Sequence, residues 1–137
     1  MLDRVLTEES YHVLSAASGA EALEIAGSAQ PDLVLLDLNL SGKSGWDTFQ
    51  RLTTENPLVP VIIITARPDQ LFPAIASGAA ALMEKPLDLA KLLRTMEGLL
   101  SEPKHVRRAR TSGKRSDFHY LPPRPNRHAA THPAREK

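Results

Sequence analysis

The sequence predicts an α/β protein with a doubly wound parallel sheet. Two observations carry this prediction. Strand-like and helix-like segments alternate through the first hundred residues, and two of the strand-like segments, 33–36 (LVLL) and 59–65 (VPVIIIT), are apolar almost throughout. Strands of that kind are typical of a parallel sheet whose two faces are both covered by helices. Alternation along the chain then places the helices in right-handed crossovers between neighbouring strands.

The first thirty residues predict two helices with a strand between them. Apolar residues at helical spacing in 2–6 indicate the first helix, and 11–17 (YHVLSAA) predicts a strand. Ser18 and Glu21 form a capping box, in which the serine oxygen accepts from the third helical N–H while Glu21 reaches back. The helix that this box opens ends before Pro31.

The middle of the chain continues the alternation. The strand at 33–36 is followed by a loop at 41–45 and a short helix at 46–53. The strand at 59–65 comes next, and 71–77 predicts a weak helix.

Proline and glycine then mark the last elements of this region. Pro73 disturbs the weak helix, and Gly78 suits its left-handed C-terminal position. Residues 79–83 predict a short strand, and Asp88 caps the most regular helix. The apolar positions of that helix follow the i, i+3, i+4, i+7 rule; they are Leu89, Leu92, Leu93, Met96, Leu99 and Leu100.

Composition sets the class of protein. The chain has 137 residues, of which 42% are hydrophobic, enough for one modest core. The absence of Cys excludes disulfides, thiolate metal sites and cysteine nucleophiles. No apolar run approaches the ~20 residues that cross a bilayer, and the residues after Met1 do not open a signal peptide. We therefore expect a cytoplasmic protein with no membrane partner.

Charge divides the chain into two parts. Residues 1–100 hold 7 Lys and Arg against 13 Asp and Glu, whereas residues 101–137 hold 10 against 3. We expect a folded domain at 1–100 and a basic tail containing Pro and His at 101–137. The tail has too few large aliphatic residues to repay chain entropy, so we expect disorder from 102 onward, apart from a docking patch at 118–121.

Three side chains that could take part in a reaction lie at or just after the ends of predicted strands. Asp37 follows 33–36, Thr65 ends 59–65, and Lys85 comes just after 79–83. Ligand sites of such sheets lie at the carboxyl ends of the strands. A carboxylate nucleophile with an ammonium and a hydroxyl beside it can accept a phosphoryl group. Each residue taken alone could have a purely structural role, as a turn residue, a strand residue or a solvated strand end. The three together favour a role in phosphoryl transfer.

These residues stand in runs that resemble the receiver domain of two-component response regulators. The resemblance covers about 2–100 and rests on 31–40 (PDLVLLDLNL), Gly45, 62–67 (IIITAR), Gly78-Ala79 and Lys85-Pro86. It implies the flavodoxin-like fold with strand order 2-1-3-4-5. It also implies signalling by protein contact rather than enzymatic activity.

The resemblance assigns a role to each site residue. Asp37 is the expected phosphoacceptor, supplied by a histidine kinase or a phosphotransfer protein. Thr65 is the expected switch hydroxyl, with the small residue Ala66 beside it. Lys85 is the expected partner of the phosphoryl oxygens, and the Lys85–Pro86 bond is often cis in receivers. Asn39 is where a receiver supplies a backbone carbonyl to Mg²⁺.

The N-terminal region departs from the receiver pattern. The first, central strand and its acidic pair are missing, so we expect an incomplete fold and a further strand upstream of Met1. Asp37 with the carbonyl of Asn39 is a poor Mg²⁺ site, because the ion demands near-octahedral oxygen ligation. Leu82 replaces an aromatic residue common three positions before the lysine, so we expect an atypical signalling face.

Other functions stay open at this point. A pseudo-receiver would keep the fold and bind a partner without phosphorylation. An aspartyl-phosphate enzyme would need an acidic residue at position 39, where this chain has Asn39, and a cap domain. The tail cluster of Arg107, Arg108, Arg110, Lys114 and Arg115 could contact nucleic acid phosphates, but no helix-turn-helix pattern follows. The tail could also lie against the acidic domain.

Overall fold

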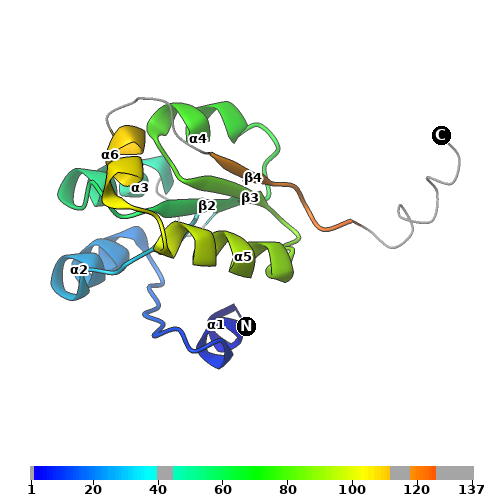
Figure 1. The fold of residues 1–137 in the computed structure, drawn as a ribbon, viewed down its shortest axis with the longest axis horizontal. Coiled ribbons are helices and arrows are strands. Elements are labelled where there is room, and N and C mark those ends of the chain that lie inside the picture. The colour runs from blue at the N-terminus through cyan, green and yellow to red at the C-terminus, as the bar shows by residue number, and fades with distance from the viewer. Residues whose placement is uncertain (1, 40–44, 112–117, 126–137) are drawn as a thin grey trace, which may run out of the picture.

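The computed structural model describes residues 2–39, 45–111 and 118–125 (Figure 1). Its strands form one parallel sheet and lie in chain order. They are β1 (Val34–Asp37), β2 (Val61–Thr65), β3 (Ala81–Glu84) and β4 (His119–Leu121). The predicted α/β class and parallel sheet are confirmed, with the predicted strands shifted by one or two residues at their ends.

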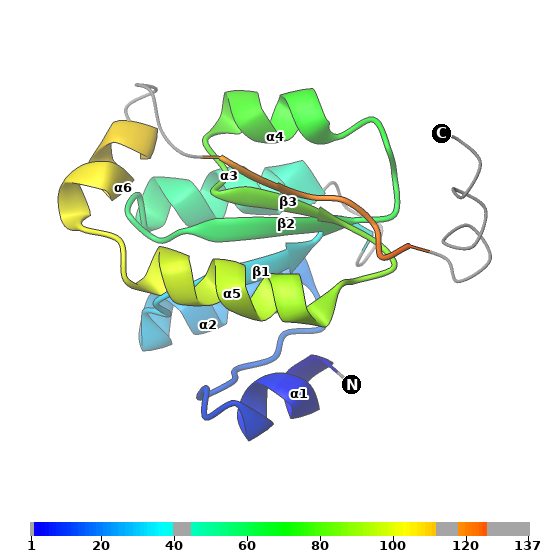
Figure 2. The same cartoon turned by 45° about the vertical axis from the view of Figure 1, so that its right-hand side comes forward.

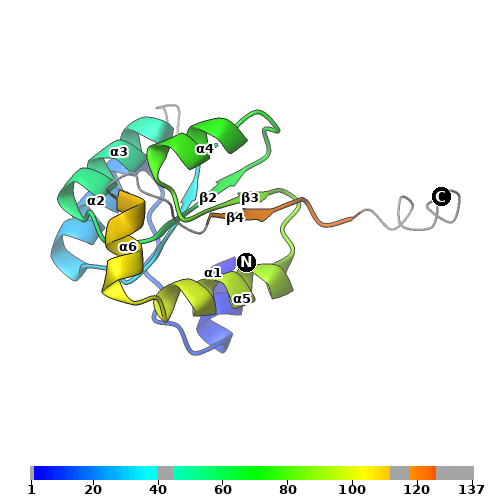
Figure 3. The ribbon, with the colours of Figure 1, turned by 45° about the horizontal axis from the view of Figure 1, so that its top comes forward.

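Helices cover both faces of the sheet, as a doubly wound fold requires. Figure 2 shows α1 and α5 below the strands and α4 above them, and Figure 3 shows α3 on the same side as α4, with α2 beside α3. The six helices of the described residues are α1 (Leu2–Glu8), α2 (Gly19–Ala29), α3 (Gly45–Glu55), α4 (Leu71–Ser77), α5 (Leu89–Leu100) and α6 (Lys104–Thr111).

The sequence of β2 explains why the core has two halves. Ile62 and Ile64 are buried in one apolar cluster with side chains of α1 and α5. Val61 and Ile63 are buried in the other, with side chains of α3 and α4. Successive strand residues point to opposite faces, so an all-apolar strand fills both layers. Burial of each such side chain contributes roughly 1.5–3 kcal/mol.

Both predicted helix caps are present. The Ser18 hydroxyl accepts a hydrogen bond from the N–H of Glu21 at 3.2 Å, and the Glu21 carboxylate accepts from the N–H of Ala17 at 2.7 Å. The Asp88 carboxylate accepts from the N–H of Lys91 at 3.2 Å. Each side chain satisfies an N–H at a helix start that has no partner within the helix.

Helix α4 accommodates the proline that we expected to disturb it. Pro73 is the third residue of α4, so its missing N–H falls among the first-turn donors that have no partner in any helix. Gly78 ends the helix with φ 89°, the left-handed conformation that we predicted there.

One predicted strand is wrong. Residues 11–16 form no strand; they run as an irregular segment between α1 and α2. The run is apolar enough for a strand, but it does not join the sheet, and no hydrogen bond links it to β1, β2, β3 or β4. A strand needs a neighbouring strand to satisfy its backbone groups.

The disorder that we expected after 102 does not hold for two segments. Residues 104–111 form α6, and 119–121 form β4, which pairs with β3. The predicted docking patch at 118–121 is therefore present: Leu121 is buried among residues of β2, β3 and α5. Residues 112–117 and 126–137 of the predicted tail, and 41–44 of the predicted loop, lie outside the described residues.

Candidate functional site

Three neighbouring strands deliver the predicted site residues to one edge of the sheet. Asp37 is the last residue of β1, Thr65 is the last of β2, and Lys85 follows β3 directly. The register places Asp37 beside Ile64 and Thr65 beside Glu84, so the strands end at nearly the same level. The carboxyl ends of parallel strands form one rim, where the sequence predicted the site.

The structure brings Asp37 and Lys85 into direct contact. The Lys85 ammonium lies 2.8 Å from the Asp37 Oδ2 and donates a hydrogen bond to it. The other oxygen, Oδ1, accepts from the backbone N–H of Asn39 at 2.8 Å. The Asp37 side chain is 25% exposed and that of Lys85 is 36% exposed. The pair is thus held in place yet open to an incoming reactant.

Thr65 belongs to the same rim, but its hydroxyl faces its own loop. The side chain is fully buried, and its Oγ1 accepts from the N–H of Arg67 at 2.9 Å. Its carbonyl accepts from the N–H of Lys85, also at 2.9 Å. Thr65 is therefore linked to Lys85 through the backbone and not to Asp37 through its hydroxyl. The next residue, Ala66, is exposed.

The loop after β2 is fixed by a polar network that no sequence motif indicates. The buried Gln70 accepts from the Trp46 indole N–H at 2.7 Å and donates to the Asp69 carboxylate at 2.8 Å. The Gln70 amide, together with the nearby Arg67 guanidinium, lowers the pKa of Asp69 from its ordinary value. No sequence signal marks Gln70, because isolated glutamines are ordinarily exposed.

Two features of the resemblance concern the ends of β1 and β3. The peptide bond between Lys85 and Pro86 is cis, as the resemblance implies. Gly45, which opens α3, lies so close to Leu38 that a Cβ there would come within 2.8 Å of the Leu38 Cα. A glycine is therefore required beside the segment that follows Asp37.

The described residues do not fit a Mg²⁺ site by themselves. Both oxygens of the Asp37 carboxylate already have partners. Across the described residues, no group of three or more His, Asp or Glu could hold a metal ion. Mg²⁺ keeps near-octahedral oxygen ligation, which one carboxylate and one carbonyl do not supply.

No helix in the described part of the chain is long and apolar enough to cross a membrane.

Comparison with known proteins places these observations in a family. The sequence model of the response regulator receiver domain matches residues 1–97. Protein PilH of Pseudomonas aeruginosa is 31% identical over 105 residues, covering 73% of this chain and 86% of PilH. Sporulation initiation phosphotransferase F of Bacillus subtilis is 33% identical over 94 residues, covering 67% of this chain and 76% of that protein.

Longer relatives share only one region with the chain. The transcriptional regulatory protein ZraR of Klebsiella oxytoca is 36% identical over 103 residues, which are 74% of this chain but 23% of ZraR. The match to the probable transcriptional regulatory protein TcrX of Mycobacterium tuberculosis spans 44% of TcrX. The chain thus spans less than half the length of these regulators.

Solved receiver domains share the fold. The non-phosphorylated HemR receiver domain of Leptospira biflexa superposes with a TM-score of 0.67 at 27% identity, covering 74% of this chain and 84% of that chain. The receiver domain of NtrX from Brucella abortus gives a TM-score of 0.67 at 26% identity, covering 72% and 86%.

Proposed function

The chain belongs to the response regulator receiver family, and we propose that it accepts a phosphoryl group on Asp37 as one step of a phosphorelay. The donor in this proposal is a histidine kinase or a phosphotransfer protein. The observation that carries the proposal is the 2.8 Å contact between the Asp37 carboxylate and the Lys85 ammonium at the rim of the sheet. A half-buried nucleophile beside a fixed cation is the arrangement that phosphoryl transfer needs.

The chemistry follows from that pair. An Asp37 oxygen attacks phosphorus, a new O–P bond forms, and the N–P bond to the donor histidine breaks. The departing imidazole keeps the electron pair of that bond and takes up a proton. Lys85 stays beside the transferred group, where its charge offsets the negative charge on the phosphoryl oxygens. The buried Thr65 hydroxyl still has its own hydrogen to donate to the new group.

Receiver domains of this family typically bind Mg²⁺, but the proposed step uses no ion. The described residues do not form a Mg²⁺ site, so in this proposal the Lys85 ammonium supplies the positive charge beside the phosphoryl group.

Receiver domains are generally signalling modules rather than enzymes, and we propose that this chain signals through protein contact. Helix α4 presents two apolar side chains to solvent, Phe72 at 81% and Ile75 at 49% exposure. A surface of that kind is suited to a protein partner. The family is typically soluble, which supports the expected cytoplasmic location. The positive charge of the tail makes nucleic acid a second, less favoured candidate partner.

A second candidate function is a pseudo-receiver that binds partners without phosphorylation. It is favoured by one specific observation: the described residues gather no metal-ligating carboxylates around Asp37. Loss of the ion would remove much of the charge neutralisation that phosphoryl transfer uses. This candidate predicts that replacing Asp37 leaves the function of the chain unchanged.

Reaction with phosphoramidate, whose P–N bond resembles that of phosphohistidine, distinguishes the two candidate functions. We expect the chain to gain one phosphoryl group by intact mass and Asp37→Asn to gain none. Asp32→Asn is the matched control, since Asp32 precedes β1 at its opposite end, and it should react as the unmodified chain does. Equal incorporation by Asp37→Asn, or none by any variant, would contradict the phosphoacceptor proposal.

A further inference from the structure

Part of the tail lies against the loop that carries Lys85. Residues 118–124, which we call the tail segment, run beside β3 and continue past its end (Figure 2). The register pairs Met83 with Leu121, so strand pairing stops two residues before Lys85. The remainder of the tail segment therefore lies where β3 gives way to the loop that begins with Lys85.

Two hydrogen bonds from the tail segment hold the residues on either side of Lys85. The Tyr120 hydroxyl donates to the Glu84 Oε1 at 2.7 Å. The backbone N–H of Arg124 donates to the carbonyl of Pro86 at 2.8 Å. Glu84 and Pro86 are the immediate neighbours of Lys85 in the chain. The residues before and after the ammonium-bearing position are therefore both tied to the tail segment.

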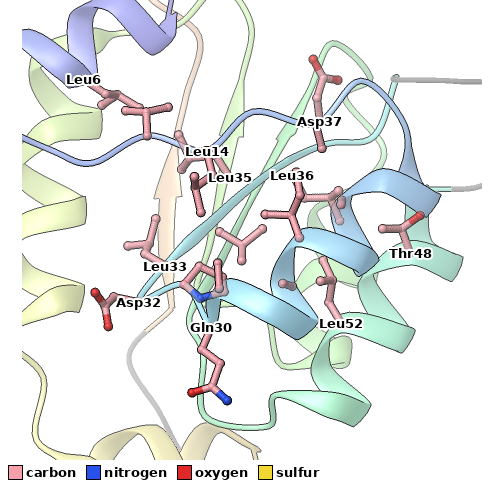
Figure 4. A pocket seen from close by; sticks show the side chains of 18 of the residues that line it. Leu6, Leu14, Gln30, Asp32, Leu33, Leu35, Leu36, Asp37, Thr48 and Leu52 are labelled. Atoms are coloured by element: carbon pink, nitrogen blue, oxygen red, sulfur yellow. The ribbon is translucent and has the colours of Figure 1, made fainter.

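The same loop is tied to the candidate site on its other side. The backbone N–H of Lys85 donates to the Thr65 carbonyl at 2.9 Å, and its ammonium donates to the Asp37 Oδ2 at 2.8 Å. Figure 4 shows the Asp37 carboxylate pointing away from the aliphatic side chains Leu35 and Leu36. This short loop thus links the candidate site to the tail segment.

The position of a lysine ammonium depends on how firmly its backbone is held. The ammonium is carried on a flexible four-carbon stem, which loses much rotamer freedom when the charge is kept in one place. The Lys85 side chain is 36% exposed, so packing alone does not confine it. Hydrogen bonds to the neighbouring residues restrict the backbone and so favour the arrangement in which the ammonium reaches Asp37.

Apolar side chains anchor the tail segment on both faces of the sheet. Leu121 is 4% exposed and lies in the apolar cluster that includes side chains of α1 and α5. Phe118 packs against the other cluster, with side chains of α3 and α4. By contrast, Tyr120 and Arg124 are exposed. Their two hydrogen bonds can therefore be removed while the apolar anchors stay in place.

We propose that the tail segment is a positioning element: by holding the residues on either side of Lys85, it keeps the ammonium against Asp37. Its own side chains act through Lys85 and do not touch the transferred group. The effect on the rate of transfer rests on the proposed function of Asp37. The effect on the position of the ammonium does not rest on that function, so the two effects are measured separately.

The first measurement is the rate at which an amine-reactive acetyl ester labels Lys85 in the full chain, followed by peptide mapping. Tyr120→Phe combined with Arg124→Pro removes both donors, since proline has no backbone N–H. We expect Lys85 to be labelled about threefold faster or more in this double variant, because an ammonium held at a carboxylate is shielded from the reagent. Lys91, at an exposed position of α5, should be labelled at an unchanged rate.

Arg124→Ala is the matched control for this measurement. It removes the same charged side chain but keeps the backbone N–H that donates to Pro86. Labelling of Lys85 in this control should equal that in the unmodified chain. Because both substituted positions are exposed, hydrogen exchange within β2 should be the same in the unmodified chain, the control and the double variant.

The second measurement is the rate of phosphoryl incorporation from phosphoramidate, followed by intact mass. The double variant should incorporate about threefold more slowly or worse, because a displaced charge stabilises the transition state less well. In a Lys85→Met chain the same two substitutions should have no further effect, since they act through the ammonium. A purely structural role of the tail segment would slow both chains equally.

Three results would overturn the proposal. Equal labelling of Lys85 in the unmodified chain and the double variant would show that the tail segment does not hold the ammonium. Faster labelling of Lys85 and Lys91 alike would show a general loosening of the fold. Unchanged incorporation in the double variant, or equal slowing in the Lys85→Met chain, would show that the hold on Lys85 does not serve the transfer. If the unmodified chain itself gains no phosphoryl group, the proposed function of Asp37 fails, whereas faster labelling of Lys85 alone still supports the positioning role.

Discussion

At the scale of single residues, the contact between Asp37 and Lys85 is expected to add little to stability. Both side chains are partly open to solvent, and ion pairs of this kind contribute only about 0–1 kcal/mol to folding. In the proposed transfer, the contact holds an ammonium where negative charge would develop on the phosphoryl group.

Replacing Lys85 tests whether its ammonium serves phosphoryl transfer rather than stability. We expect Lys85→Met to slow phosphoryl incorporation from acetyl phosphate at least tenfold while changing the free energy of unfolding by no more than about 1 kcal/mol. Incorporation is followed by intact mass and unfolding by urea titration. Lys91→Met, at an exposed position of α5, is the control. An unchanged rate in Lys85→Met would mean that the ammonium plays no part in transfer.

Tyr120 gives a prediction about pH. Its hydrogen bond to Glu84, with the negative charge of that residue, raises the pKa of Tyr120 above its ordinary value near 10. The folded state therefore favours the neutral phenol. Its contribution to stability is complete below pH 10 and is lost as pH rises through the folded pKa.

The measurement compares Tyr120→Phe with the unmodified chain. The difference in free energy of unfolding between them should be largest at pH 8 and should shrink above pH 10. A difference that stays constant across this range would show that the phenol proton is not involved.

At the scale of elements, helix ends were predictable because their signals are local. Ser18, Asp88 and Gly78 act within one turn of their own positions, and all three have the predicted capping geometry. The strand predicted at 11–17 failed because a strand depends on a neighbour that the local pattern does not reveal. The short strand β4 was not predicted, because the tail has little apolar content of its own. It forms by pairing with β3.

The cap of α5 gives a stability prediction. Asp88→Ala leaves the N–H of Lys91 without its side-chain acceptor and should destabilise the chain by about 1 kcal/mol. Thermal unfolding measures the loss. Glu97→Ala, at an exposed position of the same helix, should cost much less, and an equal cost would argue against the cap.

The attachment of β4 depends on Leu121. Leu121→Ala removes a side chain that is 4% exposed and should cost roughly 2–5 kcal/mol if β4 stays in place. A loss below that range, with fast hydrogen exchange in 119–121, would show that β4 detaches instead. His119→Ala, at an exposed position of the same strand, is the control and should leave exchange in β3 unchanged.

At the scale of the whole molecule, the site was easier to predict than the sheet that carries it. Three strand ends brought Asp37, Thr65 and Lys85 to one rim, as parallel topology requires. The direction of the Thr65 hydroxyl and the network around Gln70 depend on loop geometry, which no residue pattern encodes.

The decisive measurement identifies the residue that carries the phosphoryl group. The chain is phosphorylated with acetyl phosphate and treated with hydroxylamine, which converts an acyl phosphate to a hydroxamate, and its peptides are then mapped by mass spectrometry. We expect a hydroxamate at Asp37 and at no other acidic residue. A hydroxamate at a different carboxylate, or none in any peptide, would contradict this expectation.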